Sequence, residues 1–392
     1  MDLDRLLRRA VDLGASDVHL KVGARPMLRV DGALVALSDA SPLDEGELDH
    51  VVATIGSRAR LDLDAFANGR DLEVAYRGED LPRFRLNIFR QRGLVSCAFR
   101  VIPAVVPTLE SLQLPPGVRR LAEERHGLIL VTGATGSGKT TTLAAMIDHI
   151  NESRQQHIVT IEDPIEVLHP DRACIVSQRE VGTDAPSFGE ALRMALRQDP
   201  DIILIGELRD GETAETALHA AESGHLVLST MHTTDAAETL GRMIEFFPTA
   251  KQQQVRSIMA SVLRGVVSQR LLPAIGGGRV AAVEVMVTNA RIADLIRDDK
   301  PEQIPAAIAK GTFFDMQTFT DALIELVVSD RVDREVAANA ATNRHDFLVA
   351  LEHALKRHAA GLSRADELVP EYEEPAAPEA QLLSVSQFRR AR

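Results

Sequence analysis

The chain has 392 residues, of which 45% are hydrophobic and 26% are charged, and its formal net charge is −13. This length suits two or three domains with sizeable cores, and the composition is that of a soluble globular protein. The negative charge and an aromatic content of 4% argue against a dedicated nucleic-acid binder, so we expect no nucleic-acid partner. The two cysteines, Cys97 and Cys174, exclude a disulfide framework and a four-cysteine zinc site within one chain, and we expect no structural metal.

The amino-terminal stretch from Met1 to Arg9 carries too many charges for a secretory signal peptide. No uninterrupted apolar run is long enough to span a bilayer. The sequence therefore predicts a cytoplasmic protein, and any role at a membrane is expected to be peripheral.

Residues 1–102 predict a small α+β domain in which helices pack on an antiparallel sheet. Helical spacing of apolar residues over 3–11 indicates a short helix. Loose alternation over 18–37, interrupted by Asp31-Gly32, indicates strands and a hairpin. Three further strands are expected, and a helix before them; these elements span 43–55, 72–76, 83–89 and 94–101.

Prolines cluster over 103–116 and suggest a stiff connection between domains. Strands and helices then alternate over 117–288, which predicts a largely parallel sheet covered on both faces. The pattern over 289–365 is helical. The acidic, proline-containing tail at 366–392 is expected to be disordered. Strands of the second domain are predicted at 128–131, 158–161, 202–205, 226–229 and 280–287.

A phosphate-binding pattern, G-x-x-x-x-G-K-[ST], is matched at every fixed position between Gly133 and Thr141. The match lies between a predicted buried strand and a predicted helix, which disfavours the alternative of a glycine-rich turn that binds nothing. Glycines let backbone N–H groups approach phosphate closely, and the helix N-terminus attracts the same anion. We expect Lys139 to reach the β- and γ-phosphates of ATP and the Thr140 hydroxyl to ligate Mg²⁺. The predicted nucleotide-binding residues are Gly133, Ala134, Thr135, Gly136, Ser137, Gly138, Lys139, Thr140 and Thr141.

Two acidic segments follow predicted strands of the second domain. Glu162 and Asp163 come at the carboxyl end of one strand, where open α/β sheets place their ligands. Their carboxylates suit the positioning of Mg²⁺ or the polarisation of water, rather than a merely solvated loop. The second segment has four apolar residues before Gly206 and Glu207 and resembles a Walker B strand without its usual aspartate. Glu207 is therefore expected to act on Mg²⁺ or on water.

A further strand is flanked by His225 and His232. His232 follows the carboxyl end of this strand and is the better candidate for a contact to the γ-phosphate, because imidazole can donate a hydrogen bond in either charge state. His225 is as well explained by a structural role. A zinc site that also used His219 would have an unusual ligand spacing.

Arginines recur over 83–92, and Arg100 follows on the next strand. On a strand, Arg83 and Arg85 share a face, and Arg90 with Arg92 occupy another set of positions. Guanidinium groups are suited to binding phosphate across a subunit boundary. A solvated basic sheet face and a nucleic-acid patch are the alternatives.

The segments 133–141, 160–166, 199–210 and 224–235 together resemble the Walker A, Asp, Walker B and His boxes of the type II/IV secretion ATPase family. The resemblance covers residues 1–343 and favours the PilT/PilU branch, the type IV pilus retraction ATPases. Residues 290–297 are similar to the retraction motif of that branch (AIRNLIRE) and depart from it at several positions. The matching helix includes Arg291, Leu295, Ile296 and Arg297, and we expect Ile292, Leu295 and Ile296 to pack against a neighbouring subunit.

This resemblance implies an α/β protein: an N-terminal α+β PAS-like domain, then a RecA-like P-loop ATPase domain with a C-terminal helical portion. It implies a homohexamer that hydrolyses ATP with Mg²⁺ between subunits. Glu162 corresponds to the catalytic base, Glu207 to the Walker B acid and His232 to the γ-phosphate contact. Thr140, Glu207 and Asp163 are the implied Mg²⁺-associated residues, and Arg85, Arg90 and Arg100 are candidates that act in trans.

The implied activity is a motor for pilus retraction and twitching motility, peripheral at the inner face of the cytoplasmic membrane. An inner-membrane pilus platform protein and a paralogous pilus ATPase are the implied partners. Two alternatives remain open: an accessory ATPase that assists a separate retraction motor, as in the PilU type, and a nucleotide-binding partner that drives no work. Two cysteines cannot form the tetracysteine metal insertion that is typical of extension ATPases in this family.

Overall fold

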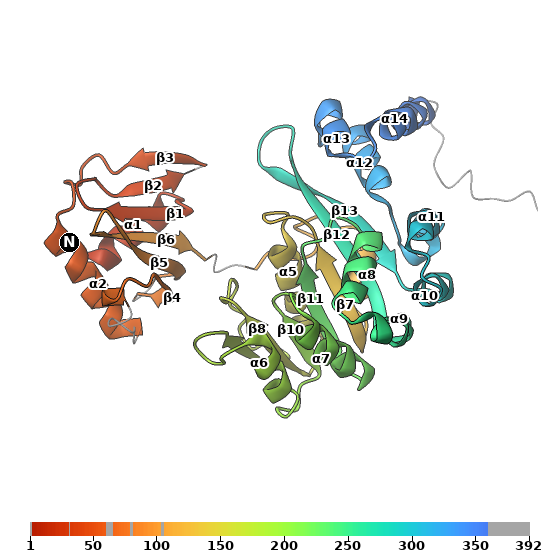
Figure 1. Ribbon diagram of the computed structural model, residues 1–392. Helices are drawn as coiled ribbons and strands as arrows, with labels where there is room; N and C mark the ends of the chain where they lie inside the picture. Colours follow the sequence, from red (N-terminus) through yellow and green to blue (C-terminus); the bar gives the residue numbers. More distant parts are fainter. Residues whose placement is uncertain (1, 31, 60–65, 79–80, 103–105, 360–392) are drawn as a thin grey trace, which may run out of the picture.

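The computed structural model describes residues 2–30, 32–59, 66–78, 81–102 and 106–359. Figure 1 shows two lobes, a smaller one formed by the N-terminal residues and a larger one formed by the rest of the described chain. The first helix of the larger lobe is α4, Pro116–Ala122. Four predicted features lie wholly or partly outside the described residues. These are Asp31 of the hairpin, residues 103–105 of the connection, residues 360–365 of the helical region, and the tail at 366–392.

The N-terminal lobe contains a six-stranded antiparallel sheet with the order β3-β2-β1-β6-β5-β4. The apolar faces of two helices share one core with the inward-facing residues of this sheet, as the amphipathic pattern of the sequence predicts. The predicted hairpin is confirmed, because Val30 pairs with Ala33. The elements are α1 Leu3–Asp12, β1 Asp17–Lys21, β2 Met27–Val30, β3 Ala33–Ala36, α2 Glu45–Ala59, β4 Leu72–Arg77, β5 Arg83–Gln91 and β6 Leu94–Val101.

Strand β5 has the alternation of a half-buried strand, with Phe84, Leu86 and Ile88 in the core. Arg83 and Arg85 therefore share the opposite face, as predicted. The prediction that Arg92 lies on the same strand as Arg90 was wrong. Strand β5 ends at Gln91, and Arg92 adopts a positive φ of 51° in the following turn.

The larger lobe contains a seven-stranded sheet with the order β13-β12-β7-β11-β10-β8-β9. All its strand pairs are parallel except β12 with β13, so the largely parallel sheet is confirmed. Every residue of β7, β10 and β11 is buried, because helices cover both faces of the sheet. The strands are β7 Gly127–Thr132, β8 His157–Glu162, β9 Ile175–Glu180, β10 Ile202–Ile205, β11 Leu226–Met231, β12 Leu263–Pro273 and β13 Arg279–Val287.

Two strands of this sheet were absent from the prediction. Strand β9 lies at the edge of the sheet and has only two apolar residues, Ile175 and Val176, so it lacks the pattern of a buried strand. Strand β12 begins at Leu263, directly after helix α9, Thr249–Val262. No turn residue separates the two, and the apolar residues of β12 read as a continuation of the helix.

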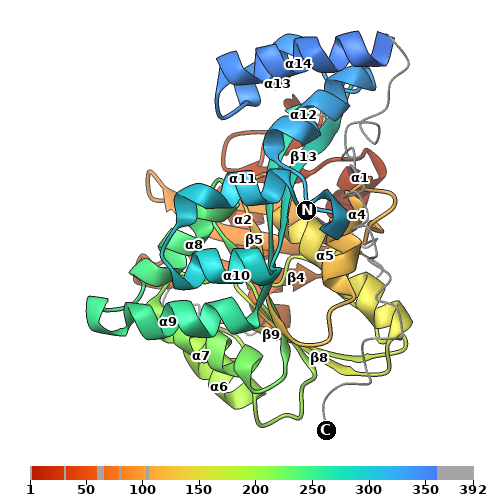
Figure 2. The same cartoon turned by 90° about the vertical axis from the view of Figure 1, so that its right-hand side faces the viewer.

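Helices after β13 form the C-terminal part of the larger lobe, as the periodicity over 289–356 predicted. Figure 1 and Figure 2 show α12 to α14 beside the far part of the β12–β13 hairpin, where Leu272 and Val280 share a separate apolar cluster with Phe319 and Phe347. The remaining helices of this lobe are α5 Lys139–Ser153, α6 Phe188–Ala195, α7 Gly211–Glu222, α8 Ala236–Glu245, α10 Ala290–Arg297, α11 Ile304–Ala309, α12 Phe319–Val328, α13 Arg334–Ala340 and α14 Arg344–Ala359.

Helix α10 corrects one expectation. Ile292, Leu295 and Ile296 are buried in the core of their own lobe, and so they are not available to a neighbouring subunit. Arg291 donates to Gln303 Oε1 over 2.9 Å, and Arg297 pairs with Asp294 over 2.8 Å. The polar face of α10, rather than its apolar face, is the exposed one.

Among the helices of the described ranges, none combines the length and the apolar character that crossing a bilayer requires.

Candidate active site

The phosphate-binding loop connects β7 to α5, as the sequence predicted. Gly136 and Gly138 adopt left-handed φ values of 79° and 93°, which a residue with a side chain rarely adopts. Gly133 has a φ of 143°, and a Cβ there would lie 2.5 Å from both Gln269 O and Ser137 Oγ. The glycines are therefore required by backbone conformation and by close packing. The loop leads directly into the N-terminus of α5, whose free amides favour an anion.

Lys139 is the first residue of α5, and its ammonium group lies over the loop. Its Nζ donates hydrogen bonds to the carbonyl oxygens of Gly133, over 2.8 Å, and Ala134, over 3.0 Å. Burial lowers the pKa of this ammonium below its usual value, and the nearby Glu166 carboxylate acts in the opposite direction. The loop thus holds a cation where the pattern places the β- and γ-phosphates of a nucleotide.

A cavity of about 610 Å³ opens in front of the loop, a volume within the range of small-molecule sites. Its walls come from the carboxyl ends of β8, β10 and β11, from α5 and from the N-terminal lobe. Among the residues predicted from sequence, it is lined by Thr135, Gly136, Gly138, Lys139, Thr140, Thr141, Glu162, Asp163, Glu207, His232, Arg85 and Arg100.

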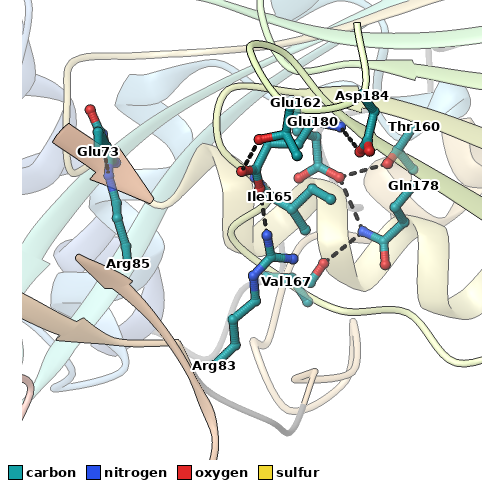
Figure 3. Close-up of polar contacts among 11 residues, drawn as sticks. Glu73, Arg83, Arg85, Thr160, Glu162, Ile165, Val167, Gln178, Glu180 and Asp184 are labelled. Atoms are coloured by element: carbon teal, nitrogen blue, oxygen red, sulfur yellow. Dashed lines mark hydrogen bonds and ion pairs between the residues drawn. The ribbon is translucent and has the colours of Figure 1, made fainter. Parts of the chain in front are cut away.

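Glu162, at the end of β8, is buried and held by two donors (Figure 3). Its Oε1 accepts hydrogen bonds from Thr160 Oγ1, over 2.6 Å, and from Gln178 Nε2, over 3.1 Å. Burial raises the pKa of the Glu162 carboxyl, and the two hydrogen bonds counteract part of this effect. A carboxylate that is oriented by donors and has a raised pKa is a stronger base than a solvated carboxylate, which suits it to accept a proton.

Glu207 and His232 come from neighbouring strands and meet at the carboxyl edge of the sheet. The Nε2–H of His232 donates to Glu207 Oε2 over 3.0 Å, and the Arg209 guanidinium contacts Glu207 Oε1. Burial lowers the pKa of His232, as do the positive charges of Lys139 and Arg209. His232 is therefore a neutral hydrogen-bond donor at pH 7, beside the cavity.

The arginine candidates separate into two groups. Arg85 and Arg100 line the cavity of their own chain, where Arg85 pairs with Glu73, and Arg100 pairs with Asp17 over 2.9 Å. Arg90 does not line it: its guanidinium lies 4.8 Å from the centre of the Phe66 ring, and it donates to Gly93 O over 3.1 Å. A contribution of these arginines in trans stays a prediction.

His225 lies at the opposite end of β11 from His232. Its Nδ1 contacts Ala220 O over 2.9 Å and Ser223 Oγ over 3.0 Å, at the junction with the preceding helix. The structure therefore does not bring His225 to the cavity.

Some residues of the site were not predicted as site residues. Gln178 holds Glu162, and His169 and Arg279 line the cavity. Gln178 lies on β9 opposite Thr160 of β8, so the pairing of these two strands brings it to the site. If β9 had been predicted as the strand next to β8, the position of Gln178 near Glu162 would have followed, because residues in register on parallel strands are neighbours.

The donor set fits a nucleotide with its Mg²⁺. The Thr140 hydroxyl and the carboxylates of Asp163 and Glu207 provide hard oxygen atoms at one cavity, which are the ligands that Mg²⁺ prefers. Within the described ranges, no three His, Cys, Asp or Glu residues are grouped closely enough to hold a metal ion.

Comparison with known proteins decides between the families that share a phosphate-binding loop. Residues 1–345 match the family described as Type II/IV secretion system protein (T2SSE). The chain belongs to this family. The T2SSE members that resemble it include the type IV pilus retraction ATPase PilT of Pseudomonas aeruginosa, which is 44% identical over 348 residues that cover 88% of this chain and 100% of that protein. The type IV pilus ATPase PilU of the same organism is 37% identical over 364 residues, which cover 93% of this chain and 94% of that protein.

Solved structures of T2SSE proteins agree with the fold. A crystal structure of the pilus retraction motor PilT with bound ADP has a TM-score of 0.83 and 42% identity, and the match covers 88% of this chain and 98% of that one. The ATPase DotB of Legionella pneumophila has a TM-score of 0.72 and 29% identity, with 86% and 94% of the two chains covered. The α/β fold of this chain is therefore that of a T2SSE ATPase.

Proposed function

We propose that this chain is an ATPase motor that drives type IV pilus retraction and so twitching motility. One observation carries the proposal: several carboxylates, a histidine and a P-loop lysine meet at one cavity, in a chain that is 44% identical to a pilus retraction ATPase over the whole of that protein. The reaction is hydrolysis of ATP to ADP and phosphate.

Each residue of the site has a proposed role in ATP hydrolysis that follows from its position. The loop amides and Lys139 bind the phosphates of ATP, and their positive charge stabilises the charge that develops during phosphoryl transfer. Mg²⁺ bound by Thr140, Glu207 and Asp163 would supply further charge neutralisation. Glu162 accepts a proton from the attacking water, because its carboxylate is oriented by Thr160 and Gln178 and its raised pKa suits a general base. His232 and Glu207 orient each other at the γ-phosphate end of the cavity.

We further propose a ring of six copies as the working form. The N-terminal lobe, residues 1–102, is a PAS-like domain that faces the nucleotide; residues 103–116 connect it to a RecA-like core at 117–288 and a helical region at 289–365. The positions of Arg85 and Arg100 support a lobe that faces the nucleotide, since both line the cavity of their own chain. Opening and closing of the lobes around ATP then switches hydrolysis on and off.

The proposed place of work is the inner face of the cytoplasmic membrane, where the ring acts on an inner-membrane pilus platform protein. A paralogous pilus ATPase is a second proposed partner. The sequence identity to PilU, 37%, supports an alternative in which this chain assists a separate retraction motor.

Two experiments test the proposal. Purified full-length protein is expected to release phosphate from ATP, and absence of any turnover would favour a nucleotide-binding partner without motor activity. A strain without this gene is expected to carry excess surface pili and to lose twitching. Cells without surface pili would indicate a role in pilus assembly and contradict the retraction assignment. Normal twitching force in a deletion strain that retains a second pilus ATPase would favour the accessory role.

A further inference from the structure

Strand β9 lies at the edge of the large sheet, between the candidate catalytic base and the N-terminal lobe. It pairs in parallel with β8, so that Gln178 lies opposite Thr160 and Glu180 lies opposite Glu162. Figure 3 shows Gln178 and Glu180 directed toward the segment that follows β8. Gln178 holds the Glu162 carboxylate, as described above, and Glu180 has different partners.

The Glu180 carboxylate joins three segments of the chain. Its Oε2 accepts a hydrogen bond from Arg83 Nη2 of the N-terminal lobe over 2.5 Å, and one from the backbone N–H of Ile165 over 3.2 Å. Its Oε1 accepts one from Thr183 Oγ1 over 3.3 Å. The side chains of Arg83 and Glu180 are only 15% and 10% exposed, so water screens this ion pair less than a surface pair.

Ile165 belongs to the loop that carries the acidic residues of the site. It lies between Asp163 and Glu166, which both line the cavity, and three residues after Glu162. The backbone of Glu162 is tied to the same region, because its carbonyl oxygen accepts from Val181 N over 2.8 Å. A displacement of the Glu180 carboxylate would therefore also displace the loop that positions these acidic residues.

Arg83 connects the same carboxylate to the other wall of the cavity. Arg83 and Arg85 are two residues apart on β5 and share one face, and Arg85 lines the cavity. The carbonyl oxygen of Arg83 also accepts from Ile102 N over 2.8 Å, immediately before the connection between the lobes. The orientation of the N-terminal lobe therefore sets the position of Arg83.

We propose that Arg83 and Glu180 form a positioning pair that couples the placement of the N-terminal lobe to the loop following Glu162. When the lobe closes on the cavity, the pair forms and holds Ile165 and its acidic neighbours in place. When the lobe turns away, Glu180 loses its cationic partner and the loop loses an anchor. This inference rests on the proposed ATPase function and names the contact through which lobe closure reaches the catalytic base.

The test uses ATP turnover by the full-length protein and four variants at the pair. Glu180→Gln keeps an oxygen for the Ile165 N–H and removes the negative charge, whereas Arg83→Gln removes the positive charge. Each is expected to lower kcat about tenfold while KM for ATP changes less than about twofold, because misplacement of catalytic groups costs rate and the phosphate loop is untouched. The double variant is expected to lose no more than either single variant, since both remove one interaction. Arg83→Lys, which keeps the charge, is expected to retain more activity than Arg83→Gln.

Hydrogen exchange of the Ile165 amide provides a readout that also works if one variant is poorly active. Arg83 and Ile165 each donate a hydrogen bond to Glu180 Oε2, so faster exchange at Ile165 in Arg83→Gln would report coupling through Glu180. Arg77→Gln is the matched control, because Arg77 is exposed and lies opposite Arg83 on the neighbouring strand. This control is expected to match the wild type in kcat and in exchange.

Three results would overturn the inference: wild-type kcat in Glu180→Gln, losses that multiply in the double variant, or unchanged Ile165 exchange in Arg83→Gln. Failure of the proposed function itself looks different, because the wild-type protein would then show no ATP turnover at all.

Discussion

His232 Nε2 lies 3.0 Å from Glu207 Oε2, and this hydrogen bond joins residues that follow two neighbouring strands, β10 and β11. The parallel pairing of these strands brings their carboxyl ends to one edge of the sheet, where the phosphate-binding loop also lies. Because the pKa of His232 is lowered by burial and by nearby cations, the imidazole is neutral at pH 7 and donates its single Nε2 proton to Glu207.

His232→Phe is expected to lower kcat by about 10- to 100-fold, which corresponds to the loss of one hydrogen bond to a charged group. Steady-state phosphate release measures this effect. The control is His219→Phe, because the His219 side chain is 60% exposed on α7 and pairs with Glu222 of the same helix. Equal losses in both variants would argue against a specific role for His232.

Lys139→Ala is expected to lower ATP turnover by about a thousandfold, because it removes a buried cation from the developing charge of the transferred phosphoryl group. Assembly is expected to persist, since the Lys139 ammonium group bonds to carbonyl oxygens of its own loop. Phosphate release and sedimentation velocity separate the two properties. Lys251→Ala, at a surface pair with Glu215, is the control for loss of a lysine. Wild-type turnover in Lys139→Ala would refute the site.

Glu162→Gln is expected to lower kcat by about 10²- to 10⁴-fold and to leave the affinity for ATP near that of the wild type, as loss of a general base predicts. The substitution is nearly isosteric, so Thr160 and Gln178 retain an acceptor oxygen. A fluorescent ATP analogue measures binding, and single-turnover phosphate release measures chemistry. Should the variant lose binding and keep its rate per bound nucleotide, Glu162 is a binding residue instead.

Gly133→Ala is expected to weaken ATP binding by about 30-fold or more, because a clash with Gln269 O and Ser137 Oγ costs about 2 kcal/mol or more in a packed loop. Gly241→Ala in α8 is the control, since a Cβ there meets nothing within 4 Å. Titration with the same fluorescent analogue compares the two. Unaltered affinity in Gly133→Ala would show that the loop relaxes without cost.

Glu284 is expected to make the free energy of unfolding depend on pH. This buried residue of β13 accepts a hydrogen bond from Ala236 N over 2.9 Å, and burial raises its pKa to about 7. A folded-state pKa above the unfolded value means that its contribution to stability is fully present below pH 4.5 and is lost as the pH rises through about 7. The loss amounts to about 3 kcal/mol.

Glu284→Gln keeps the acceptor oxygen and does not titrate. Its melting temperature relative to the wild type is therefore expected to rise by several degrees between pH 5 and pH 8. Calorimetry at several pH values tests this. A difference between variant and wild type that does not change with pH would show that Glu284 stays charged or stays protonated throughout.

Local sequence determined much of this protein. The glycine pattern and Lys139 identified the phosphate-binding loop, because the required backbone conformation and charge depend on residues within nine positions. Apolar runs also predicted β7, β8, β10 and β11, since a strand that is buried on both faces must be apolar along its length. The residues Glu162, Glu207 and His232 were predicted because each follows such a strand.

Tertiary structure decided the rest. Strand β9 carries few apolar residues, and β12 continues from a helix without a turn residue, so only pairing with neighbouring strands reveals them. Gln178 and Glu180 reach the Glu162 loop through that pairing, and Arg83 reaches Glu180 across 97 positions of sequence. Likewise, the burial of Leu295 and Ile296 depends on the helices packed around α10. Such contacts depend on the packing of distant segments, which a periodic local pattern does not encode.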